Sequence, residues 1–219
     1  MIVQAEIIRT TVNLPFENGT IKVEVVLNSD GNVATIGTGY NACIPQYAAG
    51  KLHIPSIVTH NNTTYTVTAI APVAFRFCTR LTEVEIDEGV TTIGNYAFVG
   101  CLDMEAISLP STVTQIGGGA FCKLPNLEAM KCAATMPPTW KWYDVFQVDG
   151  STNGRNPNLR LYVPTGSVSA YQAAKNDYSW TCMNTSTTSF TTVMPNSQAT
   201  TSWVTRSPLW PLSAKATIR

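Results

Sequence analysis

The chain has 219 residues, with 14 basic and 14 acidic side chains and a formal net charge of zero. This balance leaves no basic surface of the kind that binds nucleic acid, and no apolar run approaches the ~20 residues that a membrane-spanning helix needs. Charged residues make up only 13% of the chain, which is about half of the usual share. A polar but uncharged surface of this kind is common outside cells.

Residues 1–50 predict an N-terminal β-hairpin cap and a linker. Apolar residues alternate with polar ones between residues 21 and 27, residues 28–31 are turn formers, and residues 33–36 supply a returning strand. The first six residues lack the basic start and apolar core of a secretory signal. The protein is therefore either cytoplasmic or a mature segment with a new initiator methionine.

From residue 52 onward the sequence contains repeats with a period of 23 residues. Phe75, Phe98 and Phe121 occupy one position of the copy, and Cys78 and Cys101 occupy another. A fixed period in this range is typical of a solenoid, whose units bury their apolar faces by stacking on one another. We expect repeats at residues 52–78, 81–103 and 104–126, with a fourth repeat that begins at residue 127. The segment 59–64 is a turn-like insertion that we expect to extend two strands into a hairpin.

The pattern within a repeat predicts its shape. Val84 and Ile86 point to one side of a short strand while Glu83 and Glu85 point to the other. A turn glycine and a compact helical or 3₁₀ turn follow, in which Phe98 fills the centre of the coil. Stacked coils align their strands into a parallel sheet. The residues predicted to be buried are Ile70, Phe75, Val84, Ile86, Ile93, Phe98, Ile107, Leu109, Ile116 and Phe121, and those predicted to be exposed are Glu83, Glu85 and Glu105.

Two stretches carry a family resemblance: Ile-Gly-Asn-Tyr-Ala-Phe-Val-Gly-Cys at 93–101 and Ile-Ser-Leu-Pro-Ser-Thr-Val-Thr-Gln-Ile-Gly at 107–117. They closely resemble the BspA-like leucine-rich repeat family of bacterial surface proteins, and the resemblance extends from about residue 52 to residue 175. It implies a β-rich leucine-rich-repeat solenoid with short helical or 3₁₀ turns. It also implies a cell-surface or secreted protein, because members of the family have been associated with adhesion to fibronectin, fibrinogen and other bacteria.

The solenoid is expected to span residues 51–177. Its fourth strand, at 129–132, is followed by an interruption in which we interpret Val145 and Phe146 as the displaced Ala-Phe pair. A last strand at 159–163 and a helix at 167–175 close it. Residues 178–219 form a Ser/Thr-rich C-terminal extension that nevertheless contains Trp203 and Trp210. We therefore expect the extension to pack against the solenoid or against a neighbouring chain.

Little in the sequence points to a catalytic, metal-binding or cofactor-binding site. All six cysteines are expected to be free, because Cys78 and Cys101 share a buried position and a chain of this length needs no disulfide framework. Neither His53 nor His60 has a cysteine at ligand spacing, so we expect no metal site and no cofactor. The G-x-G-x-x-G and G-x-S-x-G motifs are absent. We therefore predict a protein that is not an enzyme.

The outward face of the sheet is the first candidate for function. Equivalent outward positions form columns about 4.8 Å apart, so that Glu85, Ser108 and Lys131 should align, as should Glu83, Ala106 and Ala129. Thr82, Glu105 and Glu128 should form a third column. The candidate partner-binding residues are therefore Glu83, Glu85, Glu105, Ser108, Glu128 and Lys131. An extended, partly acidic face suits a protein partner, such as a host matrix protein, although a merely solvated strand face would show the same pattern.

An inserted aromatic loop is the second candidate. Trp140, Trp142 and Tyr143 stand beside two prolines, and the alternation places both indoles on one side. Planar indoles can stack on sugar rings or anchor a protein contact. The alternative is that they cover the end of the fourth repeat. We thus predict a protein-interaction or adhesion module, with carbohydrate binding or a structural spacer as the alternatives.

Overall fold

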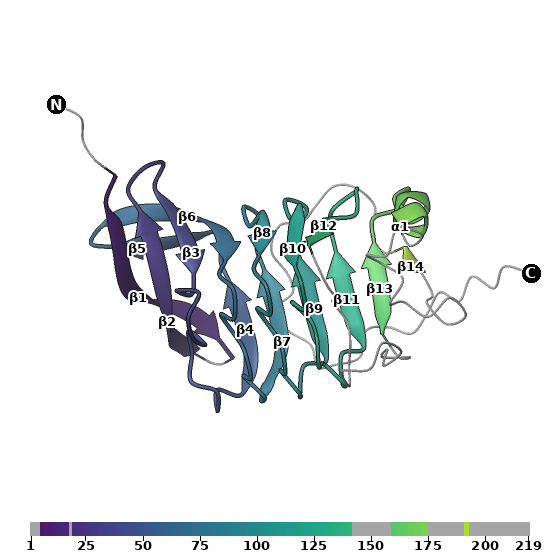
Figure 1. Cartoon of the computed structure of the whole chain (residues 1–219), viewed down its shortest axis with the longest axis horizontal. Helices are drawn as coiled ribbons and strands as arrows, with labels where there is room; N and C mark the ends of the chain where they lie inside the picture. The colour runs from purple at the N-terminus through teal and green to yellow at the C-terminus, as the bar shows by residue number, and fades with distance from the viewer. Residues whose placement is uncertain (1–4, 18, 142–158, 175–190, 193–219) are drawn as a thin grey trace, which may run out of the picture.

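A computed structural model describes residues 5–17, 19–141, 159–174 and 191–192. In this part of the chain a 14-stranded sheet curls back on itself, and one short helix, α1 (Val168–Ala174), lies at the C-terminal end (Figure 1). The curl gives the sheet two arms that enclose the apolar core between them. The fold class expected from the sequence, a β-rich leucine-rich-repeat solenoid, is confirmed.

Each arm is a parallel ladder. The β7 arm consists of β4 (Gly50–Ile54), β7 (Leu81–Ile86), β9 (Ala106–Leu109), β11 (Ala129–Cys132) and β13 (Arg160–Val163). The β8 arm consists of β6 (Thr63–Ile70), β8 (Thr92–Ile93), β10 (Gln115–Gly117) and β12 (Thr139–Lys141). Glu83 pairs with Ala106 and Ala106 with Ala129, while Thr92 pairs with Gln115. These partners are 23 positions apart in the sequence, so one coil supplies one strand to each arm.

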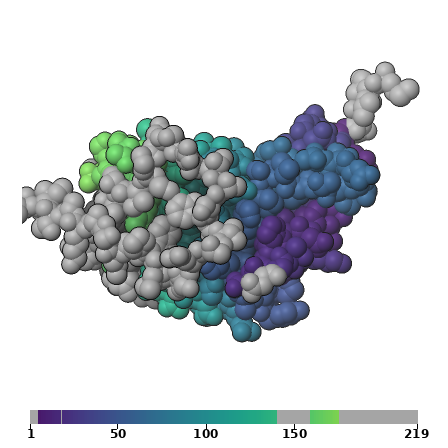
Figure 2. Space-filling model, turned by 180° about the vertical axis from the view of Figure 1, so that it is seen from behind, coloured from purple at the N-terminus to yellow at the C-terminus, as the bar shows by residue number. Residues whose placement is uncertain are grey.

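Three antiparallel strands join the arms at the N-terminal end. They are β1 (Ile7–Phe16), β2 (Gly19–Asn28) and β3 (Val33–Ile36), and β3 pairs with β6 while β1 touches β4. The hairpin predicted at 20–36 is confirmed as β2 and β3. The insertion at 59–64 also forms a hairpin, made by β5 (Ile57–His60) and β6. In the reverse view this hairpin (blue) lies beside the N-terminal strands (purple) (Figure 2).

Strand β1 was not predicted. It pairs with β2 along its whole length, from Ile7 opposite Asn28 to Phe16 opposite Gly19. Val12 and Leu14 point inward and are buried, so β1 extends the cap by a full strand. The sequence carried a signal for it, because Asn-Gly at 18–19 between two alternating runs is typical of a tight hairpin.

The core is a column of stacked side chains. All ten residues predicted to be buried are at most 4% exposed. The ring of Phe98 stacks on Phe75 at 5.0 Å and on Phe121 at 5.8 Å between centroids. The backbones of successive turns are linked as well, since Phe75 N–H donates to Ala97 O and Phe98 N–H donates to Ala120 O. The turns therefore form a third, tightly stacked side of the solenoid.

Five of the cysteines, Cys43, Cys78, Cys101, Cys122 and Cys132, are buried and form no disulfide bond, whereas Cys182 lies outside the described residues. Burial raises the pKa of the Cys78 thiol from its ordinary value of 9.0 to about 12. It also raises the pKa of Cys101, whose Sγ donates to the Phe75 carbonyl at 3.1 Å. These thiols behave as small apolar side chains in the core.

The C-terminal end also follows the prediction in part. The last strand is β13 and the helix is α1, whose Tyr171 is buried and donates from its hydroxyl to Ala134 O at 2.9 Å. Within the extension 178–219 only β14 (Thr191–Thr192) is described, and it pairs in parallel with β13. The proposed displaced pair Val145 and Phe146 lies outside the described residues.

Close packing between coils predicts a strict requirement for glycine at position 94. A Cβ at Gly94 would lie 2.3 Å from the backbone nitrogen of Pro72, whereas a Cβ at Gly19 would meet nothing within 4 Å. Because backbone cannot move aside as a side chain does, we expect Gly94→Ala to lower the free energy of unfolding by about 1–3 kcal/mol. Chemical denaturation would measure this, with Gly19→Ala as the control that stays within about 0.5 kcal/mol of the wild type. Equal stability of the two variants would contradict the packing described.

Candidate functional site

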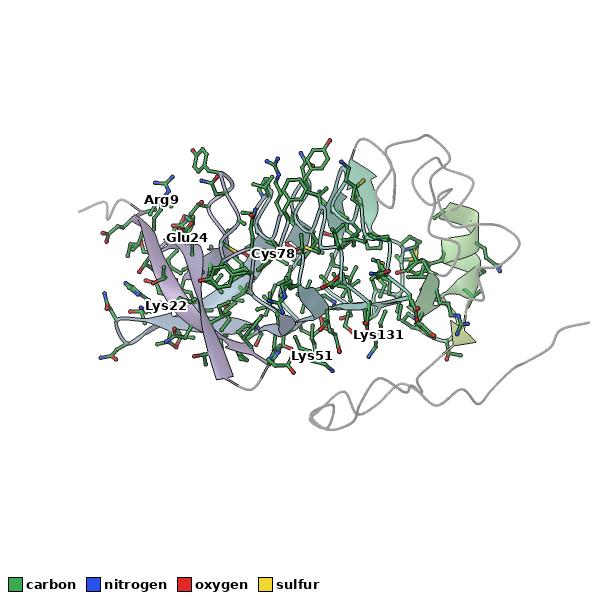
Figure 3. The ribbon with its side chains drawn as sticks, turned by 90° about the horizontal axis from the view of Figure 1, so that it is seen from below. Arg9, Lys22, Glu24, Lys51, Cys78 and Lys131 are labelled. Carbon is green, nitrogen blue, oxygen red and sulfur yellow. The ribbon has the colours of Figure 1, made fainter. Side chains whose placement is uncertain are left out.

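The outer face of the β7 arm carries two cross-strand rows of side chains. The first row is Lys51, Glu83, Ala106, Ala129 and Arg160, and the second is His53, Glu85, Ser108, Lys131 and Tyr162. The predicted columns therefore form and extend by one strand at each end. In the third column, Glu105 N–H donates to Thr82 O and Glu128 N–H donates to Glu105 O. In Figure 3, Lys51 and Lys131 project from the same side of the molecule.

Carboxylates dominate the exposed part of this face. Glu85, Glu105 and Glu128 are exposed, and none of the three makes a hydrogen bond or an ion pair through its side chain with another described residue. They lie on three successive strands or the turns that lead into them. An incoming basic group can therefore reach them without first breaking an internal contact.

The prediction that Glu83 is exposed is wrong. Its side chain is only 39% exposed, and its Oε2 forms an ion pair with Lys51 Nζ at a distance of 2.7 Å. The hydrogen bond to Glu83 is the main cause that raises the pKa of Lys51. The pair joins β4 to β7 across the surface, so Glu83 belongs to the first inter-coil contact rather than to the free acidic surface.

The neighbouring carboxylates also have internal partners. Asp87 Oδ1 lies 2.9 Å from His53 Nε2, and Asp87 Oδ2 accepts from Ser56 N–H at 3.3 Å. The Glu88 carboxylate accepts from Ser111 N–H, Ser111 Oγ and Thr112 N–H at 2.8–3.2 Å. Glu88 thus ties the turn after β7 to the turn after β9. These acidic groups stabilise the stacking of coils and leave Glu85 as the exposed acid of β7.

The aromatic loop is only partly described. Trp140 lies on β12, and its backbone pairs with Ile116 of β10. Trp142 and Tyr143 lie outside the described residues. A platform made of these three side chains therefore stays a prediction.

Exposed aromatic side chains occur elsewhere, on the turns, and sequence reasoning missed them. Tyr40 and Tyr96 are 76% and 43% exposed. The Tyr96 ring packs over the next coil, since a Cβ at Gly119 would lie 2.4 Å from its Cε1. Phe77 packs over Gly100 in the same way, and the guanidinium carbon of Arg76 lies 4.7 Å from the Phe77 centroid. The sequence carried a signal for these contacts, because an aromatic residue in one repeat is matched by a glycine at the equivalent position of the next repeat.

Among the described residues there is no group of three or more His, Cys, Asp or Glu side chains that could hold a metal ion. No helix in the described ranges is long and apolar enough to cross a membrane.

Comparison with known families identifies the repeats. Residues 44–137 match the BspA type leucine rich repeat region in six copies. These coils are BspA-type leucine-rich repeats, and the match covers less than half of the chain. Leucine-rich repeat proteins of this kind are generally non-enzymatic and bind proteins, and BspA-like members are typically found at the cell surface. The match covers β4 to β11 and leaves outside it the N-terminal strands β1–β3 and the C-terminal strands β12 and β13.

Several solved structures of bacterial leucine-rich repeat proteins are similar to this chain. A leucine-rich repeat protein from Bacteroides capillosus is 22% identical with a TM-score of 0.48, and the match covers 64% of this chain and 93% of that one. A leucine rich cell surface protein from Faecalibacterium prausnitzii is 25% identical with a TM-score of 0.45, over 66% of this chain and 35% of that one. The leucine rich repeat protein of T. pallidum is 18% identical with a TM-score of 0.47, over 66% and 70%. None of the curated proteins matches the chain.

Proposed function

We propose that this chain is a non-catalytic interaction module of a bacterial cell-surface or secreted protein, which binds a protein partner through the outer face of the β7 arm. One observation carries the proposal: Glu85, Glu105 and Glu128 are exposed on successive coils, and their side chains make no hydrogen bond or ion pair within the described residues. Glu83, Asp87 and Glu88, which surround them, are held by neighbouring coils. Glu105 and Glu128 share one column and Glu85 lies in another, so the three acids are spread over neighbouring coils of the same arm.

The chemistry of this face indicates what kind of partner it suits. The acidic positions are followed on the same face by Lys131 and Arg160, so the face changes sign along the solenoid. A partner with a basic patch followed by an acidic one would match it, and such complementarity increases the association rate and selects against other partners. The family resemblance makes host matrix proteins, fibronectin and fibrinogen among them, the first candidates.

A surface location is supported by the family, whose BspA-like members are typically cell-surface proteins. One similar structure is itself described as a leucine rich cell surface protein. The low share of charged residues, 13% of the chain, fits the same location.

Charge reversal tests the proposal. We expect Glu85→Lys/Glu105→Lys to slow association with an immobilised matrix protein by about tenfold or more at low salt. The reason is that the charge that attracts the partner during encounter changes sign. Surface plasmon resonance against a panel of matrix proteins would measure the rate. Glu6→Lys/Glu24→Lys is the matched control, since it makes the same change of charge at exposed positions of the N-terminal cap.

Equal binding by the two double variants would reject the β7-arm face as the binding surface. Sugar binding that disappears in Trp140→Ala/Trp142→Ala would favour the aromatic loop instead, because the two indoles supply its stacking surface. If the wild type bound no member of the protein panel or of the sugar panel, the result would favour a structural spacer.

A further inference from the structure

A groove of about 530 Å³ lies on the opposite arm, away from the face proposed above. One side of it is a single cross-strand row that crosses six strands: Arg9, Val26, Thr35, Ala69, Thr92 and Gln115. The other side is formed where the β8 arm turns into the stacked turns, at Thr38, Gly39, Pro72 and Asn95. Its volume lies within the range of ~300–1,000 Å³ that is usual for sites of small ligands.

Packing between coils explains why the groove exists. Gly94 and Gly117 line it, and a Cβ at either would lie 2.3–2.4 Å from a backbone nitrogen of the preceding coil. Since no side chain fits there, the surface is recessed at these two glycines, whereas the side chains of Thr92 and Gln115 project beside them. The hollow is thus built into the backbone and does not depend on the rotamer of a flexible side chain.

The polar groups of the groove are uncharged apart from one. Thr35, Thr92 and Gln115 make no side-chain hydrogen bond within the described residues, and they can both donate and accept. Asn95 uses its Oδ1 to accept from Gly118 N–H at 2.9 Å, which leaves its amide N–H₂ to donate. No carboxylate lines the groove, and Arg9 at its end is exposed and has no ion pair with a described residue.

These features select among possible occupants. An extended peptide that adds a strand needs free backbone N–H and C=O groups, but the floor of this groove is the face of a sheet whose backbone is paired across β3, β6, β8 and β10. Recognition must therefore come from side chains, and hydroxyl and amide groups that donate and accept match the hydroxyls of a sugar.

We propose that this groove binds a short acidic oligosaccharide, with a carboxylate-bearing sugar at the Arg9 end. Arg9 lies on β1, on the side of the molecule away from Lys51 and Lys131 (Figure 3). Its guanidinium can bind a carboxylate with two parallel hydrogen bonds, and it is the only charged side chain of the lining. The proposal concerns a different surface from the protein-binding face, so either can fail while the other holds.

The experiment uses the full chain and a panel of short oligosaccharides that carry sialic or uronic acid, together with their neutral counterparts. We expect Thr92→Val/Gln115→Ala to raise the Kd of the acidic sugars about tenfold or more, because two hydrogen-bonding groups are lost. Arg9→Gln should weaken binding of the acidic sugars and leave that of the neutral ones unchanged. Thr59→Val/Thr64→Ala on the exposed β5–β6 hairpin is the control and should bind as the wild type does.

Thermal unfolding of each variant separates lost binding from lost folding, and all five positions of the two groove variants and the control face outward. The proposal is overturned if the wild type retains no oligosaccharide, or if the groove variants bind as tightly as the control. It is also overturned if binding disappears only in Trp140→Ala/Trp142→Ala, which would place the sugar on the aromatic loop. Displacement of the sugar by an unrelated acidic peptide with equal affinity would show a charge effect only, and would likewise reject it.

Discussion

Replacing Phe98 by alanine is expected to lower the free energy of unfolding by about 3–5 kcal/mol. Phe98 is fully buried and its ring stacks on Phe75 below and Phe121 above. Its backbone also bonds to the next turn through Phe98 N–H and Ala120 O, so the neighbouring coils cannot collapse into the space that the ring leaves. The residual cavity then adds to the lost transfer free energy. Denaturation in urea, monitored by circular dichroism, would measure the change.

The matched control is Tyr47→Ala, which removes an aromatic ring that is 76% exposed. Surface substitutions of this kind usually change stability by no more than about 0.5 kcal/mol. If Phe98→Ala were as mild as the control, the aromatic column would not be the centre of the core. If the slope of the free energy of unfolding against urea concentration is unchanged, both variants still unfold as one unit.

The repeats could be predicted from the sequence because their information is local and periodic. A side chain such as Ile107 points inward for the same reason as Val84, and the copy at 23 residues fixes which strand lies beside which. The columns on the outer face followed from that register alone. The same reasoning gave α1 and β13, because each is a short segment with its own turn signals.

What the sequence could not supply depends on contacts between distant segments. Strand β1 is a different case: it belongs to no repeat, so the periodicity did not point to it, but its Asn-Gly hairpin signal at 18–19 is local and was missed. The position of Glu83 depends on Lys51, which lies in an earlier strand whose register shifts by a bulge at Gly50 and Lys51. The groove needs Arg9 and Gln115 in one row, and that row forms only because the sheet curls around the cap.

Stability is expected to fall steeply as the pH rises above 9. Burial raises the pKa of Cys78 to about 12, and it also raises the pKa of Cys43, Cys101 and Cys132 above the ordinary value of 9.0. Below pH 9 these thiols are protonated in both states and have no effect. Above pH 9 they ionise in the unfolded chain but stay protonated in the fold, so the unfolded state binds fewer protons and its free energy falls relative to that of the fold. Each thiol contributes a slope of about 1.4 kcal/mol per pH unit.

Four such thiols together give at most about 6 kcal/mol per pH unit, which is large against the ~5–15 kcal/mol that stabilises most proteins. Urea denaturation between pH 8 and pH 10.5 would measure the slope. Cys78→Ala is the informative variant, because it removes one titrating group and should reduce the slope above pH 9 by about 1.4 kcal/mol per pH unit. All other ionisable groups are the same in both proteins, so their effects cancel in the comparison. Identical slopes for the wild type and the variant would mean that Cys78 reaches solvent in the fold, and the column of buried thiols would then be wrong.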